Sequence, residues 1–402
     1  MSRQGLSAPR RGPGLGVVYV IGSMGLGGAE QHLLRVASAL RRCGYATEVF
    51  ALDLDGPLAL AFADAQVPLH GIRLPQWLQE RLPWPRVAAR IRIALSVPAL
   101  WWLYWRRRPQ VLHFFLPIAY LVGALTALFG PRTVRIMSRR SLNDYQARRP
   151  LLARLERKLH AQMDVVCGNS RAVLAQLVDE GIAPERLRLI YNGVDLERFR
   201  NPRNRHEVRR ELGVGGASLV FLSVANLIPY KGHADLLQAL AQAAPALPAD
   251  WWLICAGRDD GIGAALRAQA GRLGLAAHIL WLGSRLDVPD LLAAADIGVL
   301  CSHQEGFSNA VLEGMAAALP MLVTDVGGNA EAVQHGHTGW VVPARNPDAL
   351  AAALLAAARE PQRERMGCNG RERAEQLFSL QACVAAYEQL YAAACAARPC
   401  AE

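Results

Sequence analysis

Short apolar runs alternate with segments of helical pattern along the chain, and this alternation limits the fold more than any other feature. The first series begins with GVVYVIG (16–22), followed by a glycine-rich turn, an amphipathic stretch and ATEVFAL (46–52). A second series begins with SLVFLSVANL (218–227) and continues through DWWLICAG, HILWLG, DIGVLCS, PMLVTDV and TGWVVP. Fully apolar runs are typical of parallel strands buried on both faces. The sequence therefore predicts an α/β protein with two Rossmann-like, doubly wound domains.

The boundary between these domains is expected near YNGVDLERF (191–199), where a predicted strand ends in a turn. We predict a flexible tail over 1–13, a first domain over 14–190 and a second domain over 191–370. The tail contains basic residues, Gly and Pro but no apolar core of the kind found in signal peptides. A last helical stretch over 371–402 is expected to cross back onto the first domain.

Positive charge is concentrated in the first half of the chain. Residues 1–190 contain 26 Lys and Arg against 12 Asp and Glu, whereas the remainder contains 18 against 22, for a net charge of +10. This asymmetry favours an anionic membrane surface or a phosphate-bearing acceptor as the partner of the first domain. Nucleic acid is not expected, because no basic stretch is interleaved with aromatic residues in the way that binding of a single strand requires, and no zinc-finger or RNA-binding signature occurs.

The eight cysteines are scattered without C-x-x-C spacing, and several lie inside apolar runs such as LICAG and GVLCS. Buried free thiols fit a reducing cytoplasm better than a disulfide framework or a zinc site. The chain is therefore expected in the cytoplasm, and the positive charge of the first domain favours peripheral contact with the inner face of the cytoplasmic membrane.

One segment, VLHFFLPIAYLVGALTALFG (111–130), is apolar for 20 residues and long enough to span a bilayer. His113, Pro117 and two glycines interrupt it. We therefore predict a buried strand followed by a helix from Ile118 rather than a membrane span.

A second segment, ALWWLYWRRRP (99–109), places Trp101, Trp102 and Trp105 beside three arginines. A helix that mixes aromatic and basic residues is typical of an interfacial membrane anchor. A core-facing helix whose last turn is basic to suit the helix dipole would give the same pattern.

Two glutamates in SHQEGFSNAVLEGMAAALP (302–320), Glu305 and Glu313, stand on either side of a small polar corner. Ser308 or Asn309 can cap a helix here, whose first turn would offer amide groups and a positive dipole end to an anion. A carboxylate before and after an anion site suits a sugar nucleoside diphosphate, which has hydroxyls on both sides of its diphosphate. The acid/base pair of a glycosidase, which faces one bond from both sides, fits this spacing less well. Taken alone, Glu313 is more simply an exposed helix glutamate.

Lysine is rare in this chain, because only Lys158 and Lys231 among its 44 basic residues are lysine. Lys231 precedes a glycine at the start of an amphipathic helix in VANLIPYKGHADLLQAL (224–240). A compact ammonium suits a point contact with phosphate where a planar guanidinium would not fit. The alternative is a chance lysine on a surface turn.

The turn SMGLGGAEQHLL (23–34) contains Gly25, Gly27 and Gly28 between the first strand and the first helix. Glycine lets the backbone approach a phosphate, although a tight turn alone also requires it. The Asp53-Leu54-Asp55 sequence matches the short Asp-x-Asp metal-binding pattern found in one class of transferases, and we interpret it as a strand-end turn.

The stretch EGFSNAVLEGMAAALPMLVTDVGGNAEAV (305–333) resembles the hallmark of the retaining nucleotide-sugar glycosyltransferases of family 4, whose GT-B fold has two Rossmann-like domains facing across a cleft. GLGGAE, IYNGVD, VANLIPYKG, LICAG and LWLGSRLDVPDLLAAADIGVLCS occur in the usual order of that family. The resemblance covers nearly the whole chain and is strongest from 164 to 345. It implies a hexosyltransferase that moves a sugar from a nucleotide-diphosphate donor to an acceptor hydroxyl with retention of configuration, without a metal or other cofactor.

Position by position, the resemblance implies that Glu305 faces the donor sugar, Glu313 holds the ribose and Lys231 neutralises the leaving diphosphate. Backbone amides would complete the diphosphate site, and they belong to Gly27, Gly28, Gly306, Phe307, Ser308 and Asn309.

Two positions depart from the family pattern. Asn226 stands where the family commonly has an arginine, so a group that can only hydrogen-bond replaces the second phosphate cation. His113 is followed by Phe114 and Phe115 where the family often shows His-x-His. His113 either contacts the sugar after a small change of register or is a core residue.

The acceptor is the least specified part of this interpretation. MSRRSLNDYQARR (137–149), with Arg139 and Arg140, lies in the basic domain and could bind an acceptor phosphate or a lipid head group, or simply face solvent. A lipid-linked glycan or a precursor of a cell-surface polysaccharide, lipopolysaccharide or glycolipid is the expected acceptor. Alternatives are a nucleotide-sugar epimerase, a non-catalytic nucleotide-sugar-binding partner and a phosphorylase-like enzyme that would require pyridoxal phosphate.

Overall fold

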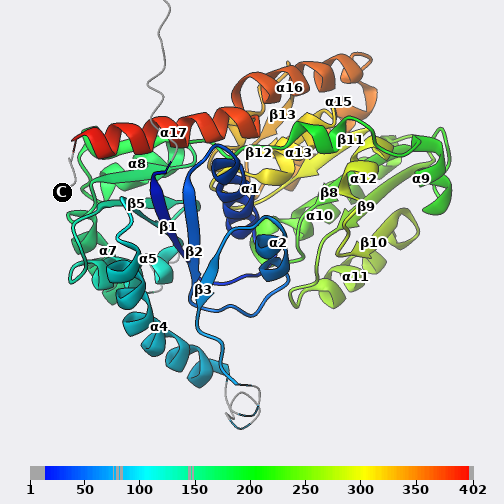
Figure 1. Cartoon of the computed structure of the whole chain (residues 1–402). Coiled ribbons are helices and arrows are strands. Elements are labelled where there is room, and N and C mark those ends of the chain that lie inside the picture. The colour runs from blue at the N-terminus through cyan, green and yellow to red at the C-terminus, as the bar shows by residue number, and fades with distance from the viewer. Residues whose placement is uncertain are drawn as a thin grey trace, which may run out of the picture. The chain divides into compact units, whose positions relative to one another are not determined.

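The computed structural model describes residues 14–75, 77, 81, 85–143, 146 and 149–397, and Figure 1 shows the chain. The chain forms two compact units. Unit 1 comprises Met1–Asn169, Val173–Ile190 and Cys383–Glu402, and unit 2 comprises Ser170–Ala172 and Tyr191–Ala382. The expected tail over 1–13 lies outside the described residues, as do residues 398–402 of the expected last segment.

Unit 1 contains a seven-stranded parallel sheet in the order β3-β2-β1-β4-β5-β6-β7. Its strands are β1 (Gly16–Ile21), β2 (Ala46–Ala51), β3 (Leu69–Gly71), β4 (Val111–Phe115), β5 (Val134–Arg139), β6 (Val165–Gly168) and β7 (Leu187–Leu189). The helices between them are α1 (Gly28–Arg42), α2 (Leu58–Asp64), α4 (Pro85–Arg107), α5 (Pro117–Ala127), α7 (Pro150–His160) and α8 (Arg171–Asp179). In register, Val17 of β1 lies opposite Val111 of β4, which fixes the centre of the sheet.

The segment 111–130 forms the strand β4 and the helix α5, which confirms the predicted strand–helix unit. Alternate residues of the central strands, such as Val20 and Phe114, pack in one core with residues of α4 and α5. Pro117 occupies the first turn of α5, where its missing amide hydrogen costs nothing. Within the described ranges, each helix is too short or too polar to cross a membrane.

Unit 2 contains a six-stranded parallel sheet in the order β10-β9-β8-β11-β12-β13. Its strands are β8 (Leu219–Val224), β9 (Trp251–Ala256), β10 (Ile279–Gly283), β11 (Ile297–Leu300), β12 (Met321–Thr324) and β13 (Gly339–Val342). The α-helices are α9 (Arg205–Glu211), α10 (His233–Ala243), α11 (Gly263–Arg272), α12 (Val288–Ala294), α13 (Asn309–Ala316), α14 (Asn329–Ala332), α15 (Pro347–Arg359) and α16 (Arg363–Leu377). The last helix, α17 (Leu380–Ala397), has its first three residues in unit 2 and the others in unit 1.

The central strands of unit 2, β8 and β11, are buried on both faces, as fully apolar runs require. Phe221 and Val299 face one hydrophobic core, whereas Val220 and Leu300 face a second core on the other side of the sheet. Together with unit 1, this arrangement confirms the predicted fold class of two doubly wound α/β domains.

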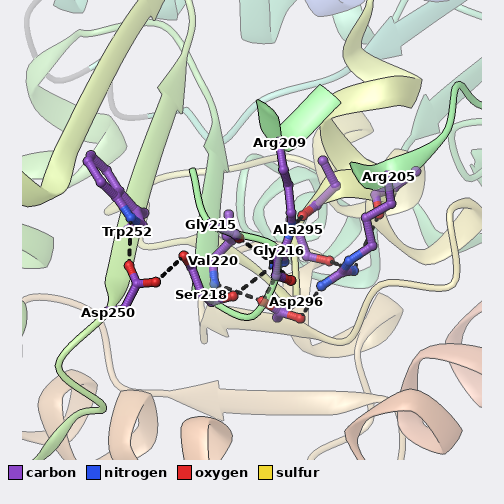
Figure 2. A network of polar contacts seen from close by, with 12 residues as sticks. Arg205, Arg209, Gly215, Gly216, Ser218, Val220, Asp250, Trp252, Ala295 and Asp296 are labelled. Carbon is purple, nitrogen blue, oxygen red and sulfur yellow. Dashed lines mark hydrogen bonds and ion pairs between the residues drawn. The ribbon is translucent and has the colours of Figure 1, made fainter. Parts of the chain in front are cut away.

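A buried ionic network joins β8 and β11 at their amino ends, and Figure 2 shows it. Asp296, one residue before β11, accepts hydrogen bonds from Arg209 Nη2 at 2.9 Å and from the amide of Val220 at 2.7 Å, and it pairs with Arg205 Nη2 at 2.5 Å. Arg209 also donates to the carbonyl oxygens of Ala294 and Ser218, so its guanidinium is well satisfied although the side chain is buried.

Candidate functional site

The strand order of unit 2 reverses between β8 and β11, which makes this pair the topological switch point of the sheet. In open parallel sheets, ligands bind beyond the carboxyl ends of the strands at such a point. The segment after β8 carries Lys231, and the segment after β11 carries Glu305. Two of the predicted site residues therefore lie where the topology expects a ligand.

Lys231 ends a short 3₁₀ turn, Pro229–Lys231, and Gly232 follows it with a left-handed φ of 71°. A Cβ atom at Gly232 would lie 2.0 Å from the carbonyl oxygen of Cys301, directly after β11. Glycine is therefore required here both by conformation and by close approach. This contact brings the loop that carries Lys231 against the loop that carries Glu305.

The side chains of Lys231 and Glu305 meet in an ion pair, with Nζ 2.5 Å from Oε1. The hydroxyl of Ser302 donates to the same carboxylate oxygen at 2.7 Å. Burial alone would lower the pKa of Lys231, but the charge of Glu305 and its hydrogen bond outweigh burial and raise this pKa. The lysine therefore stays an ammonium throughout the physiological pH range.

The loop 305–308 leads into α13, which begins at Asn309 with Ser308 at the N-cap position. The Ser308 side chain makes no capping hydrogen bond. The free amide groups of the first turn of α13 and the positive end of its helix dipole point out of the N-terminus, as an anion site requires. Glu313, four residues along α13, is half-buried.

Asn192 supports this loop from the turn after β7, and the sequence analysis did not single it out. Its buried side-chain amide donates to the carbonyl of Phe307 at 2.8 Å and to Asn309 Oδ1 at 2.7 Å. The Asn309 side chain is thereby held by a partner distant in sequence. The only sequence signal was the IYNGVD motif, in which Asn192 is the third residue.

The VGGNAE run packs directly on the same loop. A Cβ at Gly327 would lie 1.9 Å from the carbonyl oxygen of Glu305, and a Cβ at Gly328 would lie 2.2 Å from the ring of Phe307. The amide of Gly328 donates to the carbonyl of Gly306 at 2.8 Å. Two glycines at this position let the backbone of one loop support the backbone of the other.

Asn226 follows β8, but its side chain is engaged with the neighbouring strand-end loop. Its Oδ1 accepts a hydrogen bond from the amide of Arg258, at 3.2 Å, just beyond β9. The Arg258 side chain is itself paired with Asp260 at 2.6 Å. Asn226 therefore connects two loops at the carboxyl edge of the sheet.

Gly27 and Gly28 lie in unit 1, where they form the N-cap and first residue of α1. Both are exposed at the end of the loop that follows β1. A Cβ at Gly27 would lie 2.2 Å from a carboxylate oxygen of Glu30, which is the end of a flexible side chain. The predicted glycine turn is present, and its amides belong to a helix start in unit 1.

His113, for which the sequence left open a contact with the donor sugar or a place in the core, is completely buried in unit 1. Its Nδ1 lies 2.8 Å from the hydroxyl of Tyr391, and its Nε2 lies 2.8 Å from the hydroxyl of Ser138. Burial, and to a smaller extent the charge of Arg140, lowers the pKa of His113 to about 3. The described structure thus gives His113 the place of a neutral core residue.

Arg139 also differs from its expected position on an acceptor surface. Its side chain is buried between two carboxylates, Glu156 at 2.5 Å and Glu180. Arg140 is partly buried, with its guanidinium carbon 5.9 Å from the ring centre of Phe115. The aromatic and ionic partners of both arginines were not readable from the segment 137–149, because they come from elsewhere in the sequence.

The three tryptophans predicted for the acceptor or membrane side, Trp101, Trp102 and Trp105, are exposed on α4.

Among the described residues, no group of His, Cys, Asp and Glu is arranged to hold a metal ion.

Two family models match the chain. One is described as Glycosyltransferase Family 4 and matches residues 26–198, and the other is described as Glycosyl transferases group 1 and matches residues 204–373. With two doubly wound sheets and these two matches, the fold and site define a protein of the GT-B class. The chain belongs to glycosyltransferase family 4.

Curated relatives agree with this class. The N-acetyl-alpha-D-glucosaminyl L-malate synthase of Bacillus anthracis is 27% identical over 232 residues, which are 57% of this chain and 60% of that protein. A lipopolysaccharide core biosynthesis mannosyltransferase of Rhizobium meliloti (strain 1021) is 32% identical over 50% of this chain and 60% of its own. A D-inositol 3-phosphate glycosyltransferase of Geodermatophilus obscurus is 35% identical over 50% of this chain and 47% of its own. The chain thus spans about half to three fifths of the length of these relatives.

Solved structures share the fold over almost the whole chain. Anabaena Alr3699/HepE in complex with UDP-glucose has a TM-score of 0.80 at 24% identity, covering 94% of this chain and 100% of that chain. The sucrose-phosphate synthase of Thermosynechococcus elongatus has a TM-score of 0.80 at 22% identity, covering 96% of this chain and 100% of that chain.

Proposed function

We propose that this chain is a hexosyltransferase that moves a sugar from a nucleotide-diphosphate donor to an acceptor hydroxyl with retention of configuration. The observation that carries the proposal is the ion pair of Lys231 and Glu305, with Nζ 2.5 Å from Oε1, at the switch point of unit 2. The solved structure with UDP-glucose bound supports a nucleotide sugar as the donor.

In the proposed reaction, the bond between the sugar and the diphosphate breaks, so negative charge develops on the leaving oxygen and positive charge on the sugar. The ammonium of Lys231, whose pKa is raised, stabilises the leaving diphosphate together with the first-turn amides of α13. Glu305 contacts the donor sugar, and Glu313 accepts hydrogen bonds from the ribose hydroxyls. The acceptor hydroxyl attacks from the face that the leaving group vacates, which retains the configuration. No metal or other cofactor is assigned a role.

The acceptor in this proposal is an anionic or lipid-linked glycan precursor. The names of the three curated relatives include L-malate, a lipopolysaccharide core and an inositol phosphate, all of which are anionic. Residues 1–190 contain 26 basic against 12 acidic residues, which suits such an acceptor. We place the reaction in cell-surface polysaccharide, lipopolysaccharide or glycolipid synthesis, in the cytoplasm with peripheral contact at the membrane.

The test begins with thermal shift measurements of the full chain against a panel of UDP, GDP and ADP sugars, because a bound ligand raises stability by mass action. Transfer from the stabilising donor is then measured for Lys231→Ala and Glu305→Ala. We expect each to lose about 10²- to 10³-fold in kcat, the usual cost of removing one electrostatic partner of a developing charge. Arg371→Ala, which breaks an ion pair with Glu375 on α16, is the matched control and should keep full activity. Near-wild-type turnover of both site variants would refute the proposal.

The alternatives have separate readouts in the same assay. Conversion of the donor into an epimer without acceptor would favour an epimerase. Donor binding without transfer and without donor hydrolysis would favour a non-catalytic binding partner. The sequence feature that favours this alternative is Asn226, which replaces an arginine common in the family.

A further inference from the structure

The outer face of α4 is apolar to a degree that is unusual for a surface helix. Every exposed residue of α4 between positions 94 and 105 is apolar. These residues are Ala94, Leu95, Val97, Pro98, Trp101, Trp102 and Trp105. The buried side of the same helix, which includes Leu100 and Tyr104, already packs on the core of unit 1. A surface helix normally presents charged and polar residues opposite its buried stripe, so α4 has a second apolar face.

The neighbouring helix extends this face. The exposed residues from the start of α5 to the turn after it are Ile118, Leu125, Leu128 and Phe129, and all four are apolar. The indole nitrogen of Trp101 donates to the carbonyl of Phe129 at 2.9 Å, which joins the end of α5 to α4. We call the exposed residues of these two segments the α4–α5 face. In Figure 1, α4 lies at the margin of unit 1 with α5 beside it.

The tryptophans of this face are only partly covered. Trp101, Trp102 and Trp105 are 45%, 56% and 43% exposed, and Phe129 is 74% exposed. Large contiguous apolar patches on a protein surface mark sites of protein or membrane interaction. Tryptophan in particular prefers the boundary between water and hydrocarbon, because its ring is apolar and its N–H is polar.

Two exposed arginines, Arg106 and Arg108, border the face, whereas Arg107 between them is paired with Glu48 of β2 at 3.0 Å. Residues 81–143 contain 11 arginines and neither Asp nor Glu. Arg106 lies in the last turn of α4 and Arg108 directly follows this helix; both are exposed, and the guanidinium carbon of Arg106 lies 5.1 Å from the ring centre of Trp102. A second copy of this chain would bring the same positive charge against these arginines, whereas anionic lipid head groups would neutralise it.

We propose that the α4–α5 face docks unit 1 on the surface of an anionic bilayer. Its tryptophans and Phe129 enter the interfacial region, and Arg106 and Arg108 contact anionic head groups. This inference names the surface for the membrane contact in the proposed function and rests on that part of it, but it does not require glycosyl transfer.

The experiment measures binding of the full chain to vesicles of phosphatidylcholine alone and of phosphatidylcholine mixed with phosphatidylglycerol. We expect sedimentation with the mixed vesicles, weakened by added salt because salt screens the arginines. Brominated lipid in the same vesicles should quench part of the tryptophan fluorescence. The triple variant Trp101→Ser, Trp102→Ser and Trp105→Ser should bind at least about tenfold more weakly and lose that quenching. Arg106→Gln with Arg108→Gln should weaken binding to the mixed vesicles by about tenfold.

A matched control separates this surface from net charge alone. Arg272→Gln with Arg365→Gln removes the same charge from exposed positions of unit 2 and should leave vesicle binding unchanged. Thermal shift with UDP on every variant reports folding and donor binding without any membrane, so a failure of the donor-binding proposal is seen separately. The wild-type quenching measurement remains informative if the triple variant does not fold.

Two results would overturn the docking proposal. One is wild-type protein that does not distinguish anionic from neutral vesicles. The other is wild-type protein that self-associates in solution through this face, so that the triple variant becomes monomeric while vesicle binding stays the same.

Discussion

At the residue scale, Lys231 and Glu305 form an ion pair from which water is largely excluded, because their side chains are only 18% and 11% exposed. Removing one partner of such a pair leaves an uncompensated charge, so a single substitution combines a loss of function with a cost in stability. Ser302 moderates this cost for Glu305, because its hydroxyl still donates to the carboxylate when the lysine is absent. Folding therefore has to be measured on each single variant alongside transfer.

Gly232 places this pair, and its substitution is predicted to damage both the fold and the site. In Gly232→Ala, the residue keeps a left-handed φ of 71°, and its new Cβ meets the carbonyl oxygen of Cys301 at 2.0 Å. The strain of the left-handed conformation alone costs about 1 kcal/mol or slightly more. The clash with rigid backbone adds to this, and we expect a total loss of about 3 kcal/mol in the free energy of unfolding. Urea unfolding and a UDP thermal shift measure the two effects.

Gly213→Ala is the matched control for this prediction. Gly213 has nearly the same φ, 70°, but a Cβ there would have no atom within 4 Å. It should show the conformational strain of about 1 kcal/mol alone and leave UDP binding intact. Equal losses in the two variants would mean that the contact with Cys301 does not position the loop.

The sequence identified the residues whose role depends on local context and missed those whose role depends on tertiary contact. Lys231 before a glycine and Glu305 before a helix start were both visible, and the structure brings them into contact. Asn192 was missed because its partners, Phe307 and Asn309, lie more than a hundred residues away. His113 was ambiguous for a similar reason, because Tyr391, which accompanies it in the core, belongs to the last helix.

At the element scale, the amino ends of β8 and β11 are held by Asp296, opposite to the end that carries the candidate site. Asp296→Asn is predicted to lower the free energy of unfolding by about 3 kcal/mol, because Arg209 would remain buried without its counter-charge. The Arg209 side chain is 2% exposed, and the carboxylate of Asp296 is 14% exposed. Urea unfolding measures the loss, and UDP binding to the variant under native conditions should remain.

The exposed ion pair of Arg203 and Glu211 provides the comparison for this network. Both side chains are about half exposed, so the pair is screened by water and contributes little. Glu211→Gln should therefore be indistinguishable from wild type in the same unfolding experiment. A loss as large as that of Asp296→Asn would show that burial does not distinguish the two pairs.

Strands and helices were predictable because parallel strands are continuous apolar runs and the intervening helices are amphipathic. The same reasoning could not decide which way the tryptophans of α4 face. A helix that is apolar on two sides looks the same in sequence whether its second side meets protein or solvent, and only the packing of Leu100 and Tyr104 into the core shows which side is buried. The sequence also gave no sign that Arg139 is buried, because Glu156 and Glu180 reach it from α7 and from the residue after α8.

At the scale of the whole molecule, each unit contains buried histidines that stay neutral in the folded state. Burial is the main cause that lowers the pKa of His113 in unit 1 to about 3 and that of His233 in unit 2 to about 4. His32 in unit 1 is shifted in the same direction for the same reason. An unfolded histidine has a pKa of about 6.5. Between that value and the folded pKa, the unfolded chain binds protons that the folded chain does not, so stability falls as the pH drops.

This linkage predicts that the free energy of unfolding falls with acid already at pH values well above those at which carboxylates titrate. Burial alone would raise the pKa of Glu180, but hydrogen bonds from His160 and Arg139 lower it to about 2, so its contribution is lost only between about pH 4.5 and 2. The buried histidines begin to lower the stability at a higher pH than Glu180 does. From pH 7 to pH 5, His113 and His233 should each remove about 2 kcal/mol of the free energy of unfolding, which is 1.4 kcal/mol for each pH unit below about 6.5.

His233→Leu tests this mechanism, because leucine has a similar volume and does not titrate. Both ring nitrogens of His233 lack hydrogen-bond partners among the described residues, so the substitution breaks no such bond. The variant should lose about 2 kcal/mol less than wild type between pH 7 and pH 5 in urea unfolding, whatever its stability at pH 7. If His233→Leu keeps the full loss, the buried imidazole is not the group that takes up the proton, and the acid sensitivity of unit 2 has another origin.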